Sequence, residues 1–511
     1  MGNPSETPLS AVKESGGGTG YSSVSRNATL NVLGSVIPMF VTLATVPPYL
    51  RLIGDVRFGV LSLVWVFLSY FGLFEMGLGR ATSKYIAELK DDSGATREAV
   101  FWTALLVNLA VGTLGGALLW LLAGTTLPFW LKANGTIQVE VSRAMPWLAA
   151  AVPVATVTSV LVGALEGREK FAVINSQQIG ATIAFQLIPL SIAAWVGPRV
   201  DWLIAATVAA RMAANLPLLF VCARHVPLRN VPRIDRKWVR RLFSYGAWIT
   251  VSGIVGPILT SLDRFVIGVV QGAQAVTYYA IPYNFAFKLL IIPSSLQRAL
   301  FPRFSAQRSS DAQEMAVRAV LALAGMLTPI VVVAVLLTQP FFRLWVGPAV
   351  AARCTRPAEW MLIGVFVNAL AFVPYGLLQA QGRPDLAAKF HVAELVPFVG
   401  LLWAGVHIGG VTGAAVVWCA RATADAVLLF FASGIWRVVI RLIPAIVLLS
   451  AAFVGATLVG NHLLMRGALL MLLGTSSLFV SQATSPEVTR LVVSRVRAAL
   501  GRSGVIPEID A

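Results

Sequence analysis

Charged side chains are scarce in this chain of 511 residues. Asp, Glu, Lys and Arg together form 12% of it, whereas hydrophobic residues form 57%. A soluble domain usually carries about 25% charged residues, so the composition excludes an ordinary soluble protein. Cysteine is scarce as well. Cys222, Cys354 and Cys419 form no CxxC pair, which argues against a cysteine-based metal site and against a disulfide framework.

The common catalytic and nucleotide-binding motifs are also missing. No GxxxxGK[ST], HExxH or GxSxG occurs, which argues against ATP hydrolysis by this chain and against the common hydrolase sites. Asp91-Asp92 resembles a metal-binding carboxylate pair, but it lies in a charged connection, where a solvated helix end is the simpler interpretation. The four histidines show no spacing typical of metal ligands. They are His225, His391, His407 and His462.

Long apolar runs dominate the chain instead. Windows of about 20 apolar residues, the length that spans a bilayer as a helix, recur about 14 times between polar or Gly/Pro-rich breaks. We therefore expect an all-α polytopic membrane protein with about 14 transmembrane helices. Residues 1–27 contain no short apolar region followed by a cleavage site, so we expect them to form an uncleaved, flexible tail.

The net charge of +17 comes from Lys and Arg that gather in short clusters between apolar runs, so nucleic acid is not the expected partner. When connections are assigned alternately to the two membrane sides, about 27 Lys and Arg fall on the side of the N-terminus and about 9 on the other. Cytoplasmic connections are enriched in these residues, so we expect both termini in the cytoplasm. No outer connection is long enough for a catalytic domain.

An internal repeat relates the two halves of the chain. AARMAANLPLLF at 209–220 matches CARATADAVLLF at 419–430, including a mid-span arginine in each, Arg211 and Arg421. Glu166-Gly167-Arg168 matches Gln381-Gly382-Arg383, and Gly54 and Arg80 match Gly272 and Arg298. The repeat predicts two pseudo-symmetric six-helix lobes plus two C-terminal helices. Because six is even, both lobes have the same orientation, with the substrate between them.

The repeat also sets the expected domain boundaries. They are a flexible cytoplasmic tail at 1–27, an N-lobe of helices 1–6 at 28–223, a basic cytoplasmic linker at 224–241, a C-lobe of helices 7–12 at 242–434, helices 13 and 14 at 435–482, and a cytoplasmic C-terminal tail at 483–511.

Four cationic residues lie inside the predicted spans: Arg211, Arg264, Lys288 and Arg421. A charged side chain near the bilayer centre costs about 2.5–3.5 kcal/mol on insertion scales. These side chains should therefore face a watery cavity or an acidic partner. A guanidinium fork matches a diphosphate, and a lysine supplies a point charge. We expect the four residues to bind an anionic, phosphate-bearing substrate.

Pairing within the membrane is the alternative. Arg421 and Asp425 are four residues apart and share one helix face, while Asp263 or Glu394 can neutralise another cation. Asp263 and Arg264 project about 100° apart on a helix, so they cannot serve one partner. All three acids are candidates for pairing or for coupling to an ion.

Arg80 and Arg298 lie at the predicted cytoplasmic ends of helices 2 and 8, the expected spans centred near Leu68 and Leu289. Each is a candidate entry point for an anionic head group or, equally, a topology anchor whose charge reaches the membrane surface. Glu75, near the same end of helix 2, is a candidate for ion coupling or for pairing with Arg80. No cofactor and no metal are expected, and coupling to H⁺ or Na⁺ stays open.

Three stretches together resemble the polysaccharide-exporter branch, the Wzx-type flippases, of the multidrug/oligosaccharidyl-lipid/polysaccharide (MOP) superfamily. They are YLRLIGDVRFGVLSLVWVFLSYFGLFEMGLGRATSKYIAEL at 49–89, SLDRFVIGVVQGAQAVTYYAIPYNFAFKLLIIPSSLQRALFPRFS at 261–305, and the paired turns LEGREKF at 165–171 and LQAQGRPDL at 378–386. The resemblance covers helices 1 to 12. It implies a V-shaped pair of lobes in the bacterial inner membrane that opens alternately to each side.

The resemblance also implies the substrate, an undecaprenyl-diphosphate-linked oligosaccharide moved to the periplasmic leaflet for polysaccharide or lipopolysaccharide synthesis. The implied partners are this anionic lipid-linked glycan, membrane lipid, and the polymerase and glycosyltransferases of the same pathway. A lipid II flippase and a cation-coupled drug antiporter are alternatives within the superfamily, although mid-span cations argue against the antiporter. A membrane glycan polymerase or ligase and a structural scaffold are alternatives from other classes. The short outer connections argue against the enzyme, and the buried cations against the scaffold.

Overall fold

The computed structural model describes residues 19–71, 77–89, 94–123, 135–226, 231–460 and 462–484. These residues form fourteen α-helices and one 3₁₀ segment. Eleven helices are long and apolar enough to cross a membrane. Two of them, α1 (Thr19–Tyr70) and α13 (Pro384–Ala432), contain two expected spans each, bent at Gly54 and Gly410. The prediction of an all-α polytopic protein is confirmed.

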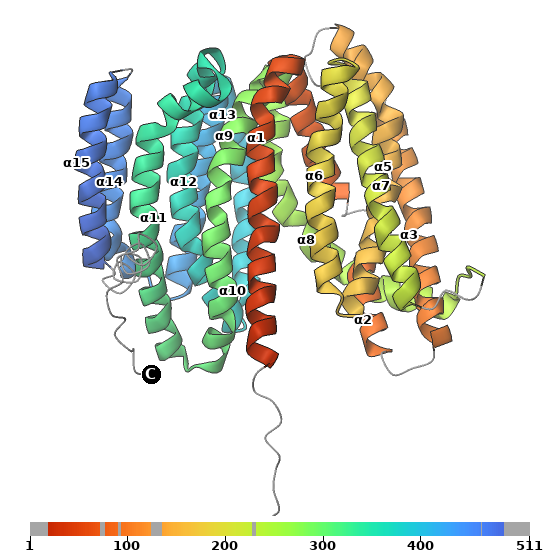
Figure 1. Cartoon of the computed structure of the whole chain (residues 1–511). Helices are drawn as coiled ribbons and strands as arrows, with labels where there is room; N and C mark the ends of the chain where they lie inside the picture. The colour runs from red at the N-terminus through yellow and green to blue at the C-terminus, as the bar shows by residue number, and fades with distance from the viewer. Residues whose placement is uncertain are drawn as a thin grey trace, which may run out of the picture.

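Figure 1 shows two groups of upright helices side by side. The first group contains α1, α2 (Leu78–Glu88), α3 (Gly94–Ala123), α5 (Gly135–Gly167), α6 (Phe171–Trp195) and α7 (Val200–His225). The second contains α8 (Arg236–Gln271), α9 (Ala273–Ala286), η2 (Phe287–Leu290), α10 (Ile291–Ala306), α11 (Ser309–Val346), α12 (Pro348–Ala380) and α13. We call them the N-lobe and the C-lobe. The end at which α1 begins is the tail end, and the opposite end, where α1 bends at Gly54, is the far end.

The first turn of each lobe has the same backbone geometry. Gly54 has φ 75° and ψ 170°, and Gly272, between α8 and α9, has φ 88° and ψ 174°. A side chain is disfavoured at such a positive φ, so glycine suits both positions. The two residues matched in the sequence repeat therefore make equivalent turns at the far end.

A second pair of helices changes which residues of the two lobes are equivalent. Helices α5 and α12 both have 33 residues, and both their starts (135 and 348) and their ends (167 and 380) are 213 positions apart. The turns that follow have a positive φ at Glu169 (58°) and at Gly382 (74°). Gly382 is thus equivalent to Glu169, two residues beyond the Gly167 that the sequence comparison pairs with it.

Two expected boundaries differ from the structure. Helix α1 already begins at Thr19, inside the tail expected at 1–27. Helix α8 begins at Arg236, inside the expected linker, and its first turns bury Trp238 and Leu242 in the core of the N-lobe. The linker region is therefore partly helical, and α8 belongs to both lobes rather than to the C-lobe alone.

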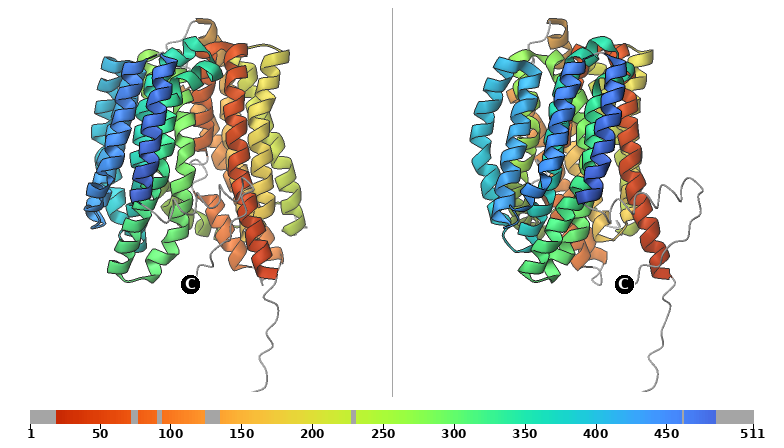
Figure 2. Two further views of the ribbon diagram at one scale, coloured as in Figure 1. Left: turned by 60° about the vertical axis from the view of Figure 1, so that its left-hand side comes forward. Right: turned by 90° about the vertical axis from the view of Figure 1, so that its left-hand side faces the viewer.

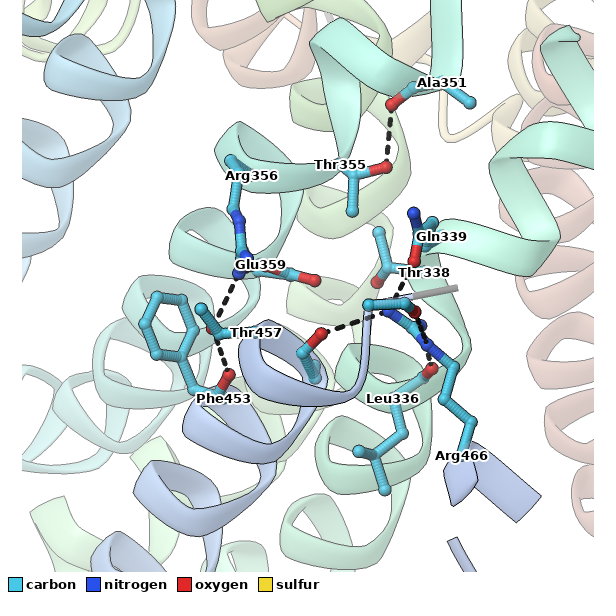
Figure 3. A network of polar contacts seen from close by, with 12 residues as sticks. Leu336, Thr338, Gln339, Ala351, Thr355, Arg356, Glu359, Phe453, Thr457 and Arg466 are labelled. Atoms are coloured by element: carbon cyan, nitrogen blue, oxygen red, sulfur yellow. Dashed lines mark hydrogen bonds and ion pairs between the residues drawn. The ribbon is translucent and has the colours of Figure 1, made fainter. Parts of the chain in front are cut away.

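Helices α14 (Val438–Val459) and α15 (Leu463–Thr484) pack on the outside of the C-lobe, against α11 (Figures 1 and 2). Arg466 at the start of α15 is only 5% exposed. Its guanidinium donates to the backbone oxygens of Leu336, Ala456 and Gly460 and to Gln339 Oε1 (Figure 3). Arg466 is therefore buried between helices although it lies beside a turn.

Candidate functional site

A cavity of about 190 Å³ lies at the junction of the two lobes. Its walls come from both arms of α1, from α6, and from α8 and α9. The lining residues are Thr42, Thr45, Val46, Tyr49, Phe58, Ser62, Trp65, Val66, Ser69, Phe185, Gln186, Arg264, Ala280 and Asn284. Arg264 is the one lining residue with a formal charge among them.

The cavity lies near the middle of the helices along their length. Arg264 precedes the turn at Gly272 by eight residues, which at 1.5 Å per residue is about 12 Å along the axis. Thr42 precedes the turn at Gly54 by twelve residues, or about 18 Å. The hydrocarbon core of a bilayer is about 30 Å thick, so Arg264 and Thr42 lie at mid-depth, whereas the lining residues Tyr49 and Phe58 lie nearer the far end.

Arg264 is held against an aromatic stack. It is 9% exposed, and its guanidinium carbon lies 3.8 Å from the ring centre of Tyr283, which stacks on Phe287 at 3.6 Å. Within the described residues Arg264 forms no ion pair, and its buried Nε has no hydrogen-bond partner. The charge is stabilised by an aromatic face, and one N–H of the guanidinium is left without a partner in the described residues.

Asp263 is fully buried and is not among the lining residues. Tyr279 donates its hydroxyl proton to Asp263 Oδ2 at 2.5 Å, and the backbone N–H of Arg264 donates to Oδ1 at 2.8 Å. The two neighbours therefore have different environments, with Asp263 bonded inside the C-lobe and Arg264 in the cavity wall.

Arg211 stands behind the cavity wall. Its Nη1 donates to the carbonyl oxygen of Leu68 at 2.9 Å, and its guanidinium lies 5.1 Å from the ring centre of Phe185, which lines the cavity. The structure gives it no acidic partner among the described residues. Arg211 thus supports the N-lobe wall from the side of α7 without lining the cavity itself.

Arg421 lies in an ionic cluster between the two arms of α13. Its Nη1 is 3.5 Å from Glu394 Oε2, and His391 Nε2 is 3.5 Å from Asp425 Oδ1. These contacts are long, and neither oxygen of Glu394 has a hydrogen-bond partner within the described residues. Arg421 therefore pairs with Glu394. Glu394 and Asp425 remain candidates for pairing or ion coupling.

The remaining candidates are more scattered. Lys288 is half-buried in η2, the 3₁₀ break within the eighth expected helix. Arg80 on α2 is exposed, as is Arg298 on α10, which donates to Ser295 Oγ at 3.1 Å. None of the three lines the cavity. Glu75 lies outside the described residues.

Sequence reasoning missed the neutral part of the cavity wall. Gln186 and Asn284 are amides within apolar runs, FQLIPL and YNFAF, and a mid-span amide is a usable signal because its burial without a partner is costly. Trp65 and Ser62 give no comparable signal, since aromatic and small hydroxyl residues are common in helix packing.

The chain matches the family described as "Polysaccharide biosynthesis protein" over residues 24–308 and the family described as "MatE" over residues 249–402. A Shigella flexneri protein named "Putative O-antigen transporter" is 29% identical over 408 residues, which cover 80% of this chain and 97% of that protein.

Solved structures share the fold at low sequence identity. The lipid II flippase MurJ in an inward closed conformation gives a TM-score of 0.64 at 12% identity, over 93% of this chain and 99% of MurJ. An inward-facing multidrug resistance MATE family transporter of the MOP superfamily gives 0.59 at 14% identity, over 80% and 94%. These proteins are named as transporters or flippases, not as enzymes.

Proposed function

Because the chain belongs to the polysaccharide biosynthesis protein family, a transporter family of the MOP superfamily, we propose that it flips an undecaprenyl-diphosphate-linked oligosaccharide across the bacterial inner membrane. The observation that carries the proposal is Arg264, a buried guanidinium that forms no ion pair within the described residues and lines a cavity between two lobes. The name of the Shigella flexneri relative supports an O-antigen-type glycan as cargo.

The chemistry of Arg264 matches a diphosphate. An arginine donates several N–H groups in a planar fork that fits phosphate oxygens, and such charge-assisted bonds are about twice as strong as neutral ones. The Nε of Arg264 lacks a partner among the described residues, and an incoming phosphate would supply one. A drug cation fits this wall less well, because the one formally charged lining residue is itself a cation.

The tail end is the cytoplasmic end in this proposal. It carries the connections rich in Lys and Arg, including the exposed Arg233, Arg236, Lys237, Arg240 and Arg241 around the start of α8, as cytoplasmic connections do. We expect a single cysteine at the far-end position Pro198 to react with an impermeant maleimide in spheroplasts. A cysteine at Arg308 should react only after permeabilisation. The reverse pattern would invert the assignment.

Transport itself is tested with purified protein in proteoliposomes. The assay follows the movement of a fluorescent polyprenyl-diphosphate-linked sugar between leaflets. Arg264→Ala is expected to lower the flipping rate at least ten-fold, since one lost charge-assisted bond to phosphate is worth about 1.5–3 kcal/mol. Arg264→Lys should retain part of the rate because it keeps the charge.

The matched control is Arg318→Ala. Arg318 is an exposed arginine on α11 that pairs with Glu314 one helical turn away, and its loss should leave flipping unchanged. Equal rates in the wild type and in folded Arg264→Ala protein would remove Arg264 from the transport path and leave the proposal without its main support.

A further inference from the structure

We propose that the N-lobe wall of the cavity is a subsite for one neutral sugar ring, next to the place where Arg264 holds phosphate. This inference rests on the proposed function and deepens it, because it assigns a second recognition task to residues outside the cationic set. The residues are Ser62 and Trp65 on the second arm of α1, Gln186 on α6, and Asn284 on α9.

The aromatic side chains form a defined surface around Trp65. Its ring centre lies 5.5 Å from Tyr49, 5.7 Å from Phe185 and 6.1 Å from Phe58, and all four residues line the cavity. A sugar ring has an apolar C–H face as well as a rim of hydroxyl groups. Ligand pockets commonly combine such aromatic walls with a few placed polar groups. Tyr49 and Phe58 are fully buried and support the wall from behind, whereas the half-buried Trp65 and Phe185 offer the apolar half of a sugar site.

Three buried polar atoms in the lining residues have no hydrogen-bond partner in the described part of the chain. They are Ser62 Oγ, Trp65 Nε1 and Arg264 Nε. Ser62 and Arg264 are 5% and 9% exposed. Buried polar groups almost always have hydrogen-bond partners, and each buried group without a partner lowers stability by about 1–3 kcal/mol. All three belong to residues that line one cavity, and a ligand that brings several hydrogen-bonding groups could pair with them after small side-chain movements.

Gln186 is positioned by the first arm of α1. Its Oε1 accepts from Thr45 Oγ1 at 3.2 Å, and its backbone oxygen accepts from Tyr49 Oη at 2.7 Å. Because the oxygen is engaged, the amide nitrogen is the group left for a ligand. Asn284 supplies a second amide from the C-lobe side. Amide donors on two sides of an aromatic floor suit the hydroxyl rim of a sugar.

Charge and size restrict the occupant further. Apart from Arg264, the lining is neutral, so the wall itself does not favour a second anionic group. A volume of about 190 Å³ equals on the order of six water molecules in the liquid. That space is large enough for one sugar ring. Because Arg264 holds the diphosphate beside this wall in the proposed function, the ring attached directly to the diphosphate is the one that the wall contacts.

The test measures binding to the full-length protein in lipid nanodiscs. The probes are farnesyl diphosphate and farnesyl diphosphate linked to glucose, galactose, N-acetylglucosamine or N-acetylgalactosamine. We expect at least one glycosylated probe to bind about ten-fold tighter than farnesyl diphosphate, as one or two added hydrogen bonds would give. Trp65→Phe and Gln186→Ala should each reduce that preference to about three-fold or less, without weakening farnesyl diphosphate itself.

Thr182→Ala, one turn before Gln186 on α6, half-buried and outside the cavity lining, is the matched control and should behave as wild type. The sugar subsite is wrong if no glycosylated probe binds tighter than farnesyl diphosphate, or if Trp65→Phe and Gln186→Ala weaken all probes equally. Failure of the proposed function looks different. In that case farnesyl diphosphate itself fails to bind, or its binding is unchanged in Arg264→Ala.

Discussion

At the scale of single residues, the three mid-span arginines show three ways of keeping a guanidinium inside a membrane. Arg421 has an acidic partner at 3.5 Å, Arg211 has a backbone carbonyl, and Arg264 has an aromatic face. Only Arg264 has neither an ion pair nor a backbone carbonyl partner for its guanidinium among the described residues. Three residues of the same type therefore have different roles. What distinguishes Arg264 as the candidate for ligand binding is the group that its guanidinium contacts, not the fact that it is an arginine.

Glu169 gives a prediction about stability. It is the one non-glycine residue with a positive φ in the described chain, at 58°, and the equivalent C-lobe residue is Gly382 at 74°. A side chain in this left-handed region costs roughly 1–2 kcal/mol, whereas glycine adds about 0.5–1 kcal/mol of entropy cost on folding. We expect Glu169→Gly to raise the thermal unfolding midpoint slightly in detergent.

The reverse change provides the check on this argument. Gly382→Ala should lower the midpoint, because no atom outside the turn lies within 4 Å of the added Cβ and only the backbone conformation resists it. If both variants shift the midpoint in the same direction, the two turns are not energetically equivalent and the strain argument fails.

The sequence could reveal the charged part of the site but not its neutral wall. Arg264 stands out in the sequence because a charge within an apolar run is costly wherever it lies. Ser62 and Trp65 acquire their role only from the meeting of α1 with α6, which is tertiary information. Arg466 shows the opposite error. Its position beside a turn suggests an exposed side chain, but neighbouring helices bury it.

At the scale of elements, α8 joins the two lobes. Near its start, Trp238 packs against Tyr85 of α2 with ring centres 5.5 Å apart, and at its end Gln271 Nε2 donates to the Val406 oxygen of α13 at 3.0 Å. The C-lobe boundary expected at residue 242 falls inside this helix. The hydrophobic pattern of the sequence indicates which residues are buried, but not which lobe they pack against. Any relative movement of the lobes must therefore involve α8.

Helices α14 and α15 depend on one arginine, which gives a second stability prediction. Arg466 of α15 contacts α11 through Leu336 and Gln339 and α14 through Ala456 (Figure 3). Lysine cannot reproduce this planar fork, and buried groups left without partners cost about 1–3 kcal/mol each. Arg466→Lys should therefore destabilise the protein by on the order of 2–4 kcal/mol.

The measurement is thermal unfolding in detergent, with Arg441→Lys on the exposed face of α14 as the control. Limited proteolysis adds a local measurement, because weakened docking should make the segment between α13 and α14 more accessible before the rest of the chain. An Arg466→Lys protein as stable as the control would show that the apolar faces of α14 and α15 hold them without the arginine.

At the scale of the whole molecule, the far end is closed by contacts between the lobes. Asp55, just after the bend of α1, accepts from Gln274 Nε2 and Tyr278 Oη of α9, each at 2.7 Å, and its carbonyl oxygen accepts from Thr277 Oγ1 at 2.5 Å. A Cβ on Gly59 would overlap the carbonyl oxygen of Ala273. The helices approach too closely here for a lipid-linked sugar to pass, so release at this end requires the lobes to separate.

This closure makes a prediction for transport. With Asp55→Cys and Gln274→Cys joined by a short bifunctional thiol reagent, the far end cannot open, and flipping in proteoliposomes should stop. The three native cysteines are buried, so they should contribute little background reaction. Each single-cysteine variant treated with the same reagent should keep its untreated rate. Undiminished flipping by the cross-linked double variant would mean that substrate does not leave between α1 and α9, and alternating access about this contact would have to be abandoned.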